Sequence, residues 1–373
     1  MALCFMEGNE AVAWGAKIAG CRFFAGYPIT PATTIYNAML AFLPPEGGVC
    51  LQGEDEIASI GFCLGASMAG AKTMTATSGP GISLYSEHIS FAIASEIPLV
   101  IVDVQRLGPS TGSATRGADG DVQFLQWGNS GGQPVIVLAP TDVADCVTLT
   151  VHAFNLAERF RCPVFIAANK EISMTKESLD LEKLSIPDLV DRKAAPKGEA
   201  YIPFAVSEGS RVPDFLPIGA DRLVRQTSST HGEDGYLTVD PLTIRRFQER
   251  RQEKILAAVD DFTFFDEIPA PNAETLLITY GVTARAARTA VAKLQAAGEP
   301  VSLLVLKTLW PVPEALIRQK SQGAKRVVVA EMNLGQYLRE IQRICCDRQV
   351  EFVGTMDGNL ITPARIEEVL SHG

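Results

Sequence analysis

Two prolines stiffen a turn in the loop Gly26–Pro31, which also carries the hydroxyl group of Thr30. We predict that Thr30 is the N-cap of a helix and that Pro31 is its first residue. The free backbone N–H groups at such a helix start attract an anionic group, although a threonine there also serves as a purely structural cap. This loop is a first candidate for a binding site.

The segment Gln52–Glu56 places three acidic residues at the start of a second predicted helix. Glu54 and Asp55 suit the positive end of the helix dipole. Glu56 comes just before a helical face of small and apolar residues, so a helical path points its carboxylate toward a dry pocket. A carboxylate in a dry pocket can share a proton with a bound heterocycle. The alternative is a solvated glutamate of the first helical turn.

The loop Gly108–Asp121 contains four glycines, four hydroxyl residues and one arginine. This composition brings backbone and small hydroxyl groups close to a ligand, and the planar fork of Arg116 can hold a carboxylate. Arg116 can instead pair with Asp119 or Asp121 in a surface loop. A fourth loop, Thr77–Gly81, has glycines that let a ring or a phosphate approach the backbone.

These loops follow short apolar runs that alternate with helical patterns, which predicts a parallel sheet with helices on both faces. Ligands of such sheets bind beyond the carboxyl ends of the strands, where the four loops stand. The runs that we expect to be strands are 21–24, 49–51, 72–75, 98–102, 134–138 and 163–166, and later 275–280, 301–306 and 326–330.

The alternation breaks down between the two sets of runs, in a stretch rich in Pro, Gly, Ser and Thr. We therefore predict a first α/β domain at 1–191, a linker or docking segment at 192–270 and a smaller α/β domain at 271–373. The linker includes one polar helix that starts near residue 241.

The bulk composition excludes several classes of protein. With 373 residues, 47% of them hydrophobic and 20% charged, the chain can form more than one globular core. It has no apolar stretch of about 18 residues and no signal peptide pattern, so we expect a cytoplasmic protein without a membrane span. A net charge of -10 argues against nucleic acid. Eight cysteines without a CxxC pair argue against an iron–sulfur cluster or a zinc site in this chain.

Eight motifs, taken in their order and spacing, resemble the alpha subunits of 2-oxoacid:ferredoxin oxidoreductases, those acting on 2-oxoglutarate above all. The resemblance spans nearly the whole chain. The motifs are Gly8–Ala11, Gly20–Pro31, Gly53–Ala58, Gly65–Gly70, Thr77–Ser83, Gly108–Gly112 followed by Thr115 and Arg116, Lys307–Pro311, and Glu331–Gln336.

The resemblance implies that the first domain is the pyrimidine-binding domain of a thiamine diphosphate enzyme and that the last is a transketolase C-terminal-like domain. Glu56 matches the glutamate that hydrogen-bonds the aminopyrimidine ring and promotes loss of the thiazolium C2 proton. Thr30 and Arg116 match the residues that hold the keto acid group and the carboxylate of the substrate. Around them, we assign Pro28, Ile29, Ser78 and Gly79 to the cofactor, and Tyr27, Ser110 and Thr111 to the substrate.

The reaction that the resemblance implies is the coenzyme A-dependent oxidative decarboxylation of a 2-oxo acid, with electrons passed to ferredoxin. The chain lacks the GDG and asparagine pattern that holds the diphosphate and magnesium. It also lacks cysteines for a cluster. A beta subunit is therefore expected to bring the diphosphate site, Mg²⁺ and a [4Fe-4S] cluster, with gamma or delta subunits as further partners.

The loop around Arg116 departs from the pattern of the 2-oxoglutarate enzymes. Ser113 and Ala114 stand where Met-Pro is usual, and Gly117–Asp121 replaces a Thr-x-Gln-Gly-Asp stretch. We expect 2-oxoglutarate to be converted to succinyl-CoA, but a branched-chain or aromatic 2-oxo acid stays open as the substrate. A non-catalytic scaffold that kept the fold, and a transketolase-type enzyme that transfers a ketol unit, are the other readings.

Overall fold

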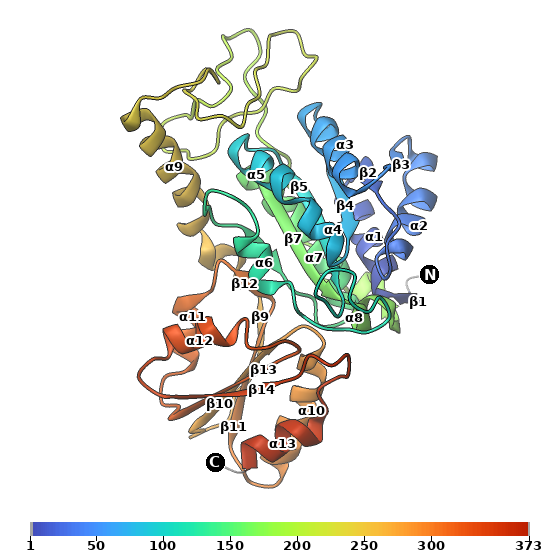
Figure 1. Cartoon of the computed structure of the whole chain (residues 1–373), viewed down its shortest axis with the longest axis vertical. Coiled ribbons are helices and arrows are strands. Elements are labelled where there is room, and N and C mark those ends of the chain that lie inside the picture. The colour runs from blue at the N-terminus through green and yellow to red at the C-terminus, as the bar shows by residue number, and fades with distance from the viewer. Residues whose placement is uncertain (1–2, 372–373) are drawn as a thin grey trace.

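The structure is a computed structural model that describes residues 3–371, and it contains two α/β units joined by a long linker (Figure 1). The first unit has a seven-stranded sheet that is parallel except at one edge. In the order in which they lie side by side, its strands are β12 (Thr308–Trp310), β6 (Ile136–Leu138), β7 (Pro163–Asn169), β5 (Leu99–Gln105), β4 (Thr73–Thr77), β2 (Phe23–Gly26) and β3 (Val49–Gln52). The predicted parallel sheet is confirmed.

Helices cover both faces of this sheet because its central strands are buried on both sides. One face packs against α1 (Gly8–Ile18), α2 (Thr33–Phe42) and α7 (Val143–Phe160). The other packs against α3 (Glu56–Met68), α4 (Pro80–Leu84), α5 (Ser86–Ala94) and α6 (Val122–Trp127). The two faces form separate apolar clusters.

The predicted start of the helix after the first loop is wrong. α2 begins at Thr33, with Ala32 and not Thr30 at the N-cap position. Residues 30–32 form a turn, which Asn9 holds by donating hydrogen bonds of 2.8 Å to the carbonyl of Pro31 and to the hydroxyl of Thr34. Thr30 therefore stands in an exposed turn ahead of the helix.

The linker runs over the first unit without long elements until α9 (Pro241–Leu256) and the short helix η3 (Val259–Phe262), and α9 descends toward the second unit in Figure 1. Buried charges anchor it to the first unit. The fully buried carboxylate of Glu96 forms ion pairs of 2.5 Å with Arg250 and 2.7 Å with Lys254, both on α9.

The second unit is a five-stranded sheet whose only antiparallel member is its edge strand β9. The strands, in order, are β14 (Gln349–Gly354), β13 (Arg326–Glu331), β10 (Thr275–Tyr280), β11 (Val301–Leu306) and β9 (Phe265–Ile268). One face packs against α10 (Thr283–Ala296) and α13 (Pro363–Ser371), and the other against α11 (Glu314–Lys320) and α12 (Leu338–Ile344).

Two strands cross the predicted domain boundaries. β9 lies inside the range that we assigned to the linker, yet it pairs with β11 in the second sheet. β12 follows the second unit's strand β11 in sequence, but it pairs with β6 and closes one edge of the first sheet. The two units therefore share backbone hydrogen bonds in addition to side-chain contacts.

A small two-stranded sheet completes the architecture. It pairs β1 (Leu3–Glu7) with β8 (Lys176–Asp180), and α8 (Lys170–Met174) lies beside it. Two short 3-10 helices, η1 (Pro44–Glu46) and η2 (Leu181–Lys183), occupy connections. Within residues 3–371, no helix combines the length and the apolar character needed to cross a membrane.

Candidate functional site

The predicted loops meet at one edge of the first sheet. β2, β4 and β5 are adjacent parallel strands, so the loops that follow them leave at the same edge. Gly79, after β4, and Ser110, after β5, lie against each other: a Cβ atom placed on Gly79 would be 3.6 Å from the carbonyl oxygen of Ser110. The structure thus brings three of the four candidate loops together.

Glu56 ends the remaining loop, Gln52–Glu56, and is buried, with 7% of its surface exposed. It is the first residue of α3, because the carboxylate of Asp55 caps this helix by accepting a 2.7 Å hydrogen bond from the N–H of Ala58. Glu54, by contrast, is exposed. The solvated alternative for Glu56 therefore does not hold in the structure.

Gly81 on α4 makes room for the Glu56 side chain. A Cβ atom at Gly81 would lie 2.8 Å from Cγ and 2.9 Å from Oε1 of Glu56, and 1.9 Å from Oγ1 of Thr77. The hydroxyl oxygens of Thr77 and Ser78 are buried and have no hydrogen-bond partner among the described residues. Buried polar atoms normally have a hydrogen-bond partner, so these hydroxyl groups near a carboxylate are suited to hydrogen-bond a bound polar heterocycle.

Arg106 ties the loops to one another, and the sequence analysis missed it. Its guanidinium group donates hydrogen bonds of 2.5 Å from Nη1 to the carbonyl of Thr30 and of 2.9 Å from Nη2 to the carbonyl of Thr111. Its side chain also lies beside Gly79, whose added Cβ would be 3.8 Å from Cγ of Arg106. One buried side chain thus contacts the loops after β2, β4 and β5.

The substrate-side residues of the prediction are open to the outside. Tyr27, Thr30, Ser110, Thr111 and Arg116 are exposed. The cofactor-side residues lie deeper: Pro28, Ile29 and Gly79 are partly buried, and Ser78 is fully buried. The predicted substrate residues thus form an exposed side of the site, and the predicted cofactor residues form a more buried side, around the same strand ends.

Arg116 does not pair with Asp119 or Asp121, the alternative that its loop composition left open. Among residues 3–371 it forms no ion pair, whereas Asp119 accepts a 3.1 Å hydrogen bond from Asn169. The stem of Arg116 instead packs on Gly358 of the second unit, where an added Cβ would lie 2.8 Å from Cβ of Arg116. The charged end of Arg116 is left available to a ligand.

The second unit grips the loop that carries Arg116, and Figure 1 shows this loop between the two units. The N–H of Asp119 donates a 2.8 Å hydrogen bond to the carbonyl of Met332, and the side-chain amide of Asn333 donates one of 2.8 Å to the carbonyl of Asp119. Gln336 donates a hydrogen bond of 2.5 Å to the carbonyl of Gly120. The motif Glu331–Gln336 therefore acts as a clamp on this loop.

Three buried carboxyl groups stand behind the loops. Asp103, in the last part of β5, has both carboxylate oxygens buried without a hydrogen-bond partner among the described residues, apart from its contact with Asp121. Burial, reinforced by the charge of Asp121, raises the pKa of Asp103 well above its usual range. Burial also raises the pKa of Asp121 to about 6 and that of Asp119 to about 7. Burial thus shifts all three groups toward the protonated form, but Asp121, with a pKa of about 6, is mostly ionised at pH 7 and Asp119 is about half ionised there.

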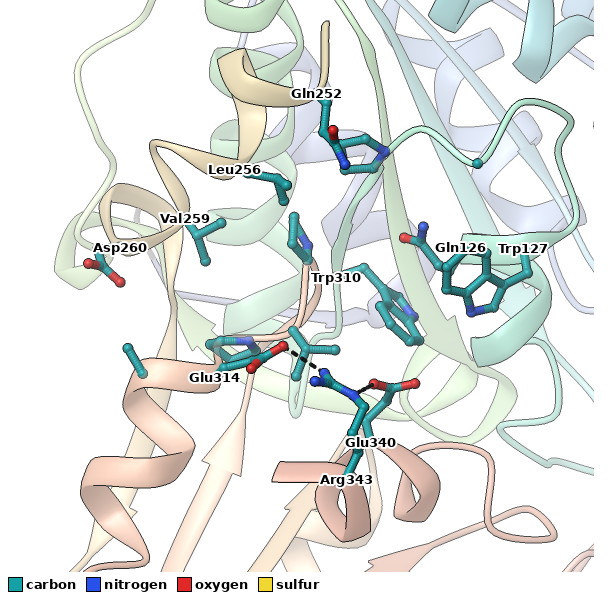
Figure 2. Close-up of a pocket in the computed structure, with 16 residues that line it drawn as sticks. Gln126, Trp127, Gln252, Leu256, Val259, Asp260, Trp310, Glu314, Glu340 and Arg343 are labelled. Atoms are coloured by element: carbon teal, nitrogen blue, oxygen red, sulfur yellow. Dashed lines mark hydrogen bonds and ion pairs between the residues drawn. The ribbon is translucent and has the colours of Figure 1, made fainter. Parts of the chain in front are cut away.

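A cavity of about 680 Å³ lies elsewhere, between α6, the end of α9 and the start of α11 (Figure 2). Its wall includes Trp127 and Trp310, and an ion pair of 2.7 Å joins Arg343 to Glu314 beside it. None of the predicted site residues lines this cavity. This cavity is therefore not the candidate site, although it is large enough for a small molecule.

Family models match most of the chain. Residues 14–249 match the model described as pyruvate flavodoxin/ferredoxin oxidoreductase, thiamine diphosphate-binding. Residues 273–366 match pyruvate:ferredoxin oxidoreductase core domain II. The two matched ranges correspond to the first unit with most of the linker, and to the second unit.

Two curated relatives match over nearly their whole length. The 2-oxoglutarate synthase subunit KorA of Methanothermobacter thermautotrophicus is 39% identical, with 98% of this chain and 97% of the relative covered. The ketoisovalerate oxidoreductase subunit VorB of Methanothermobacter marburgensis is 35% identical, with 97% and 95% covered.

A solved structure matches the fold throughout. It is the 2-oxoglutarate:ferredoxin oxidoreductase from Magnetococcus marinus with 2-oxoglutarate, coenzyme A and succinyl-CoA bound, with a TM-score of 0.95 and 33% identity. The match covers 100% of this chain and 65% of that one. The chain described here thus spans about two thirds of the length of that relative.

Proposed function

Because this chain belongs to the pyruvate flavodoxin/ferredoxin oxidoreductase family and is a subunit of a thiamine-diphosphate-dependent 2-oxoacid:ferredoxin oxidoreductase, we propose that its substrate is 2-oxoglutarate, oxidised to succinyl-CoA. Four relatives named 2-oxoglutarate synthase subunit KorA are 38 to 40% identical and two named for ketoisovalerate are 34 to 35% identical, while a 2-oxoglutarate oxidoreductase subunit KorA of Mycobacterium tuberculosis is 31% identical. The proposal is supported by the position of Glu56, Thr30 and Arg116 in loops that follow adjacent parallel strands at the carboxyl edge of one sheet.

Glu56 is proposed as the catalytic residue of this chain. When bound, thiamine diphosphate supplies the electron sink through which a 2-oxo acid loses carbon dioxide. The buried carboxylate of Glu56 would hydrogen-bond a ring nitrogen of the pyrimidine and hold a proton there, and Gly81 leaves room for this carboxylate. Ser78 and Gly79, with Pro28 and Ile29, line the pyrimidine side.

Thr30 and Arg116 are proposed to bind the substrate. The hydroxyl of Thr30 donates to the keto acid group, and the fork of Arg116 faces a carboxylate. Because Arg116 has no ion-pair partner among residues 3–371, its charge is available to a substrate with two carboxylates. Tyr27, Ser110 and Thr111 complete the exposed wall. These groups act by orientation and charge complementarity.

A second chain is proposed to complete the site. Beside Glu56, the neighbouring helices α3 and α4 expose the large apolar side chains of Ile57, Phe62 and Leu84, each more than 40% exposed. Exposed apolar side chains gathered on neighbouring helices indicate a protein interface. The beta subunit is expected to cover them and to bring the diphosphate and Mg²⁺ site and the [4Fe-4S] cluster, and ferredoxin takes the electrons.

Reconstitution tests this function directly. The chain is purified alone and together with its beta subunit, and reduction of a viologen dye is followed with coenzyme A and a panel of 2-oxo acids. We expect activity only in the complex, with kcat/KM highest for 2-oxoglutarate. A lone chain that binds thiamine diphosphate and reduces the dye would contradict the shared site. A preference for 2-oxoisovalerate or an aromatic 2-oxo acid would contradict the substrate.

A further inference from the structure

Two buried aspartates meet at the base of the loop 108–121, which carries Arg116. Asp103 lies near the end of β5, just before this loop, and Asp121 is the last residue of the loop. The side chain of Asp103 is fully buried and contacts that of Asp121. The N–H of Asp121 also donates a 2.9 Å hydrogen bond to Oε1 of Gln105. These contacts join the two ends of the loop.

The contact between Asp103 and Asp121 requires a shared proton. Among the described residues, both carboxylate oxygens of Asp103 and Oδ2 of Asp121 are buried without a hydrogen-bond partner outside the pair. Two carboxylates that touch in a buried place repel each other strongly when both are ionised. A single proton placed between them turns this repulsion into a hydrogen bond, and the two groups then titrate as a pair.

The charges around the pair favour one remaining negative charge. Burial and the charge of Asp121 raise the pKa of Asp103 well above its usual range, and burial raises the pKa of Asp121 to about 6. The positive charge of Arg106 attracts the carboxylate of Asp121, whereas the nearby carboxyl group of Asp119 disfavours a second negative charge. The backbone of Gly79 also faces Asp103. At neutral pH the pair therefore holds one proton.

The loop above this base is a constrained turn. Ser110 has a φ of +54°, a left-handed conformation that is unfavourable for a residue with a side chain. The N–H of Leu107 donates a 2.8 Å hydrogen bond to the carbonyl of Arg116, and the N–H of Ser113 donates one of 2.8 Å to the carbonyl of Leu107. A shift of the base is therefore passed on to Arg116.

We propose that Asp103 and Asp121 are a positioning pair whose shared proton closes the base of the loop 108–121 and so holds Arg116 in place for the substrate. This inference rests on the proposed function, which assigns Arg116 to the substrate. Because the folded state binds the proton more tightly than the unfolded chain does, the closure is present at low and neutral pH. It is lost as the pH rises through the pKa of the pair.

Asparagine substitutions separate the proton from the contact. The amide group of Asp103→Asn donates a hydrogen bond to the Asp121 carboxylate at every pH, so this variant is locked in the closed form. Asp103→Leu has a similar size but no donor, and it leaves the charge of Asp121 without this partner. Asp121→Asn is a second locked variant, and the Asp121 side chain forms no capping hydrogen bond with α6 that the substitution would remove.

The first measurement is hydrogen exchange of residues 107–116 in the reconstituted complex, read by mass spectrometry. Each variant is compared with the wild type at the same pH, so that the intrinsic dependence of exchange on pH cancels. We expect equal exchange at about pH 6.5 and at least about tenfold faster exchange in the wild type than in Asp103→Asn at about pH 9.5, since buried carboxyl groups keep a proton up to about pH 9. Asp103→Leu should exchange fast at both pH values.

The second measurement is KM for 2-oxoglutarate at the same two pH values. The KM of the wild type should rise at least about fivefold relative to that of Asp103→Asn from the lower to the higher pH, while the ratio of their kcat values changes less. Asp145 provides the matched control, because it is buried on α7, 8% exposed, and forms an ion pair of 2.9 Å with Lys307. Asp145→Asn should lower the unfolding temperature without making its KM ratio to the wild type depend on pH.

The two measurements separate this inference from the proposed function. If the loops of the wild type and of Asp103→Asn exchange equally at the higher pH, the shared proton does not close the loop, whether or not the complex is active. A loop that opens as expected in a complex that acts on no 2-oxo acid keeps the closure and contradicts the proposed function. An active complex whose loop opens while KM stays constant overturns the role in substrate binding. If Asp103→Leu does not fold, Asp121→Asn must still reproduce the behaviour of Asp103→Asn, and its failure to do so contradicts the pair.

Discussion

The side-chain amide of Asn333 donates a 2.8 Å hydrogen bond to the backbone carbonyl of Asp119, so the second unit directly holds the loop that carries Arg116. The same amide group donates to Glu331 and Tyr280, each at 2.9 Å, and both of these residues are buried. The second unit is therefore part of the structure that positions the substrate side of the site.

Removal of this clamp should weaken both the fold and substrate binding. Asn333→Ala leaves the carbonyl of Asp119 without its donor and removes one of the several donors of the buried Glu331 carboxylate, which should cost about 1 to 3 kcal/mol of stability. We expect a lower unfolding temperature and a raised KM for 2-oxoglutarate. Asn37→Ala, at an exposed position of α2, is the control. Equal behaviour of the two variants would show that the clamp is dispensable.

Gly358 gives a more selective test of Arg116. An added methyl group at Gly358→Ala would lie 2.8 to 3.1 Å from three carbon atoms of Arg116 and displace its side chain. We expect KM to rise roughly tenfold for 2-oxoglutarate, with a smaller effect on a 2-oxo acid that has one carboxylate. Competition assays between the two 2-oxo acids measure the ratio of their kcat/KM values.

The control for Gly358 is Gly323→Ala. Gly323 has a φ of +81°, almost the same as the +82° of Gly358, but an added Cβ there meets nothing within 4 Å. Both variants carry the backbone cost of a left-handed residue, about 1 kcal/mol. If Gly323→Ala changes the substrate ratio as much as Gly358→Ala does, the contact with Arg116 is not the cause.

Gly81→Ala should displace Glu56 and weaken the binding of thiamine diphosphate. The new methyl group cannot stand 1.9 Å from Oγ1 of Thr77, so it must push the side chains of Thr77 and Glu56 aside. We expect at least a tenfold weaker affinity of the complex for thiamine diphosphate, measured by titration of the cofactor-free complex. A folded variant that binds the cofactor as tightly as the wild type would refute the assignment of Glu56 to the cofactor.

The buried carboxyl groups predict a pH dependence of stability. Burial raises the pKa of Asp119 to about 7, above the value of about 4 in an unfolded chain. The folded state thus binds this proton more tightly than the unfolded chain does. The stability that Asp119 contributes is fully present below about pH 4 and is lost as the pH rises through 7. Asp119→Asn cannot titrate, so its unfolding temperature should improve relative to wild type from pH 5 to pH 8.

The exposed Asp347 provides the comparison for Asp119. Asp347→Asn should keep the same offset from the wild type across this range, because the pKa of Asp347 is lowered by its neighbour Arg348 and its titration lies below pH 5. A difference between Asp119→Asn and the wild type that does not change from pH 5 to pH 8 would mean that Asp119 does not titrate there.

Most strands could be predicted because a strand buried on both faces reads as an apolar run, as β5 and β13 do. β12 could not, since it has three residues and its partner β6 is far away in sequence. The start of α2 was misplaced because Pro31 reads as a first helical residue. The contacts of Asn9 that hold a turn there depend on tertiary structure.

The candidate site was predicted in part. Loop composition led to Glu56, Thr30 and Arg116, whose roles stay predictions. It did not lead to Arg106, because an arginine after a strand looks like a solvated residue and its carbonyl partners come from distant loops. Asp103 offered a usable signal, as a carboxylate inside an otherwise apolar strand indicates a polar cluster at that end of the sheet.

The most direct test of the central claim is Glu56→Gln in the reconstituted complex, with Glu54→Gln as the exposed neighbour that serves as control. Glutamine keeps the size of the side chain but cannot hold the proton, so turnover of 2-oxoglutarate should fall at least about 100-fold, while thiamine diphosphate still binds and Glu54→Gln stays fully active. Turnover of Glu56→Gln within about threefold of the wild type would remove Glu56 from catalysis and favour a scaffold that kept the fold without the chemistry.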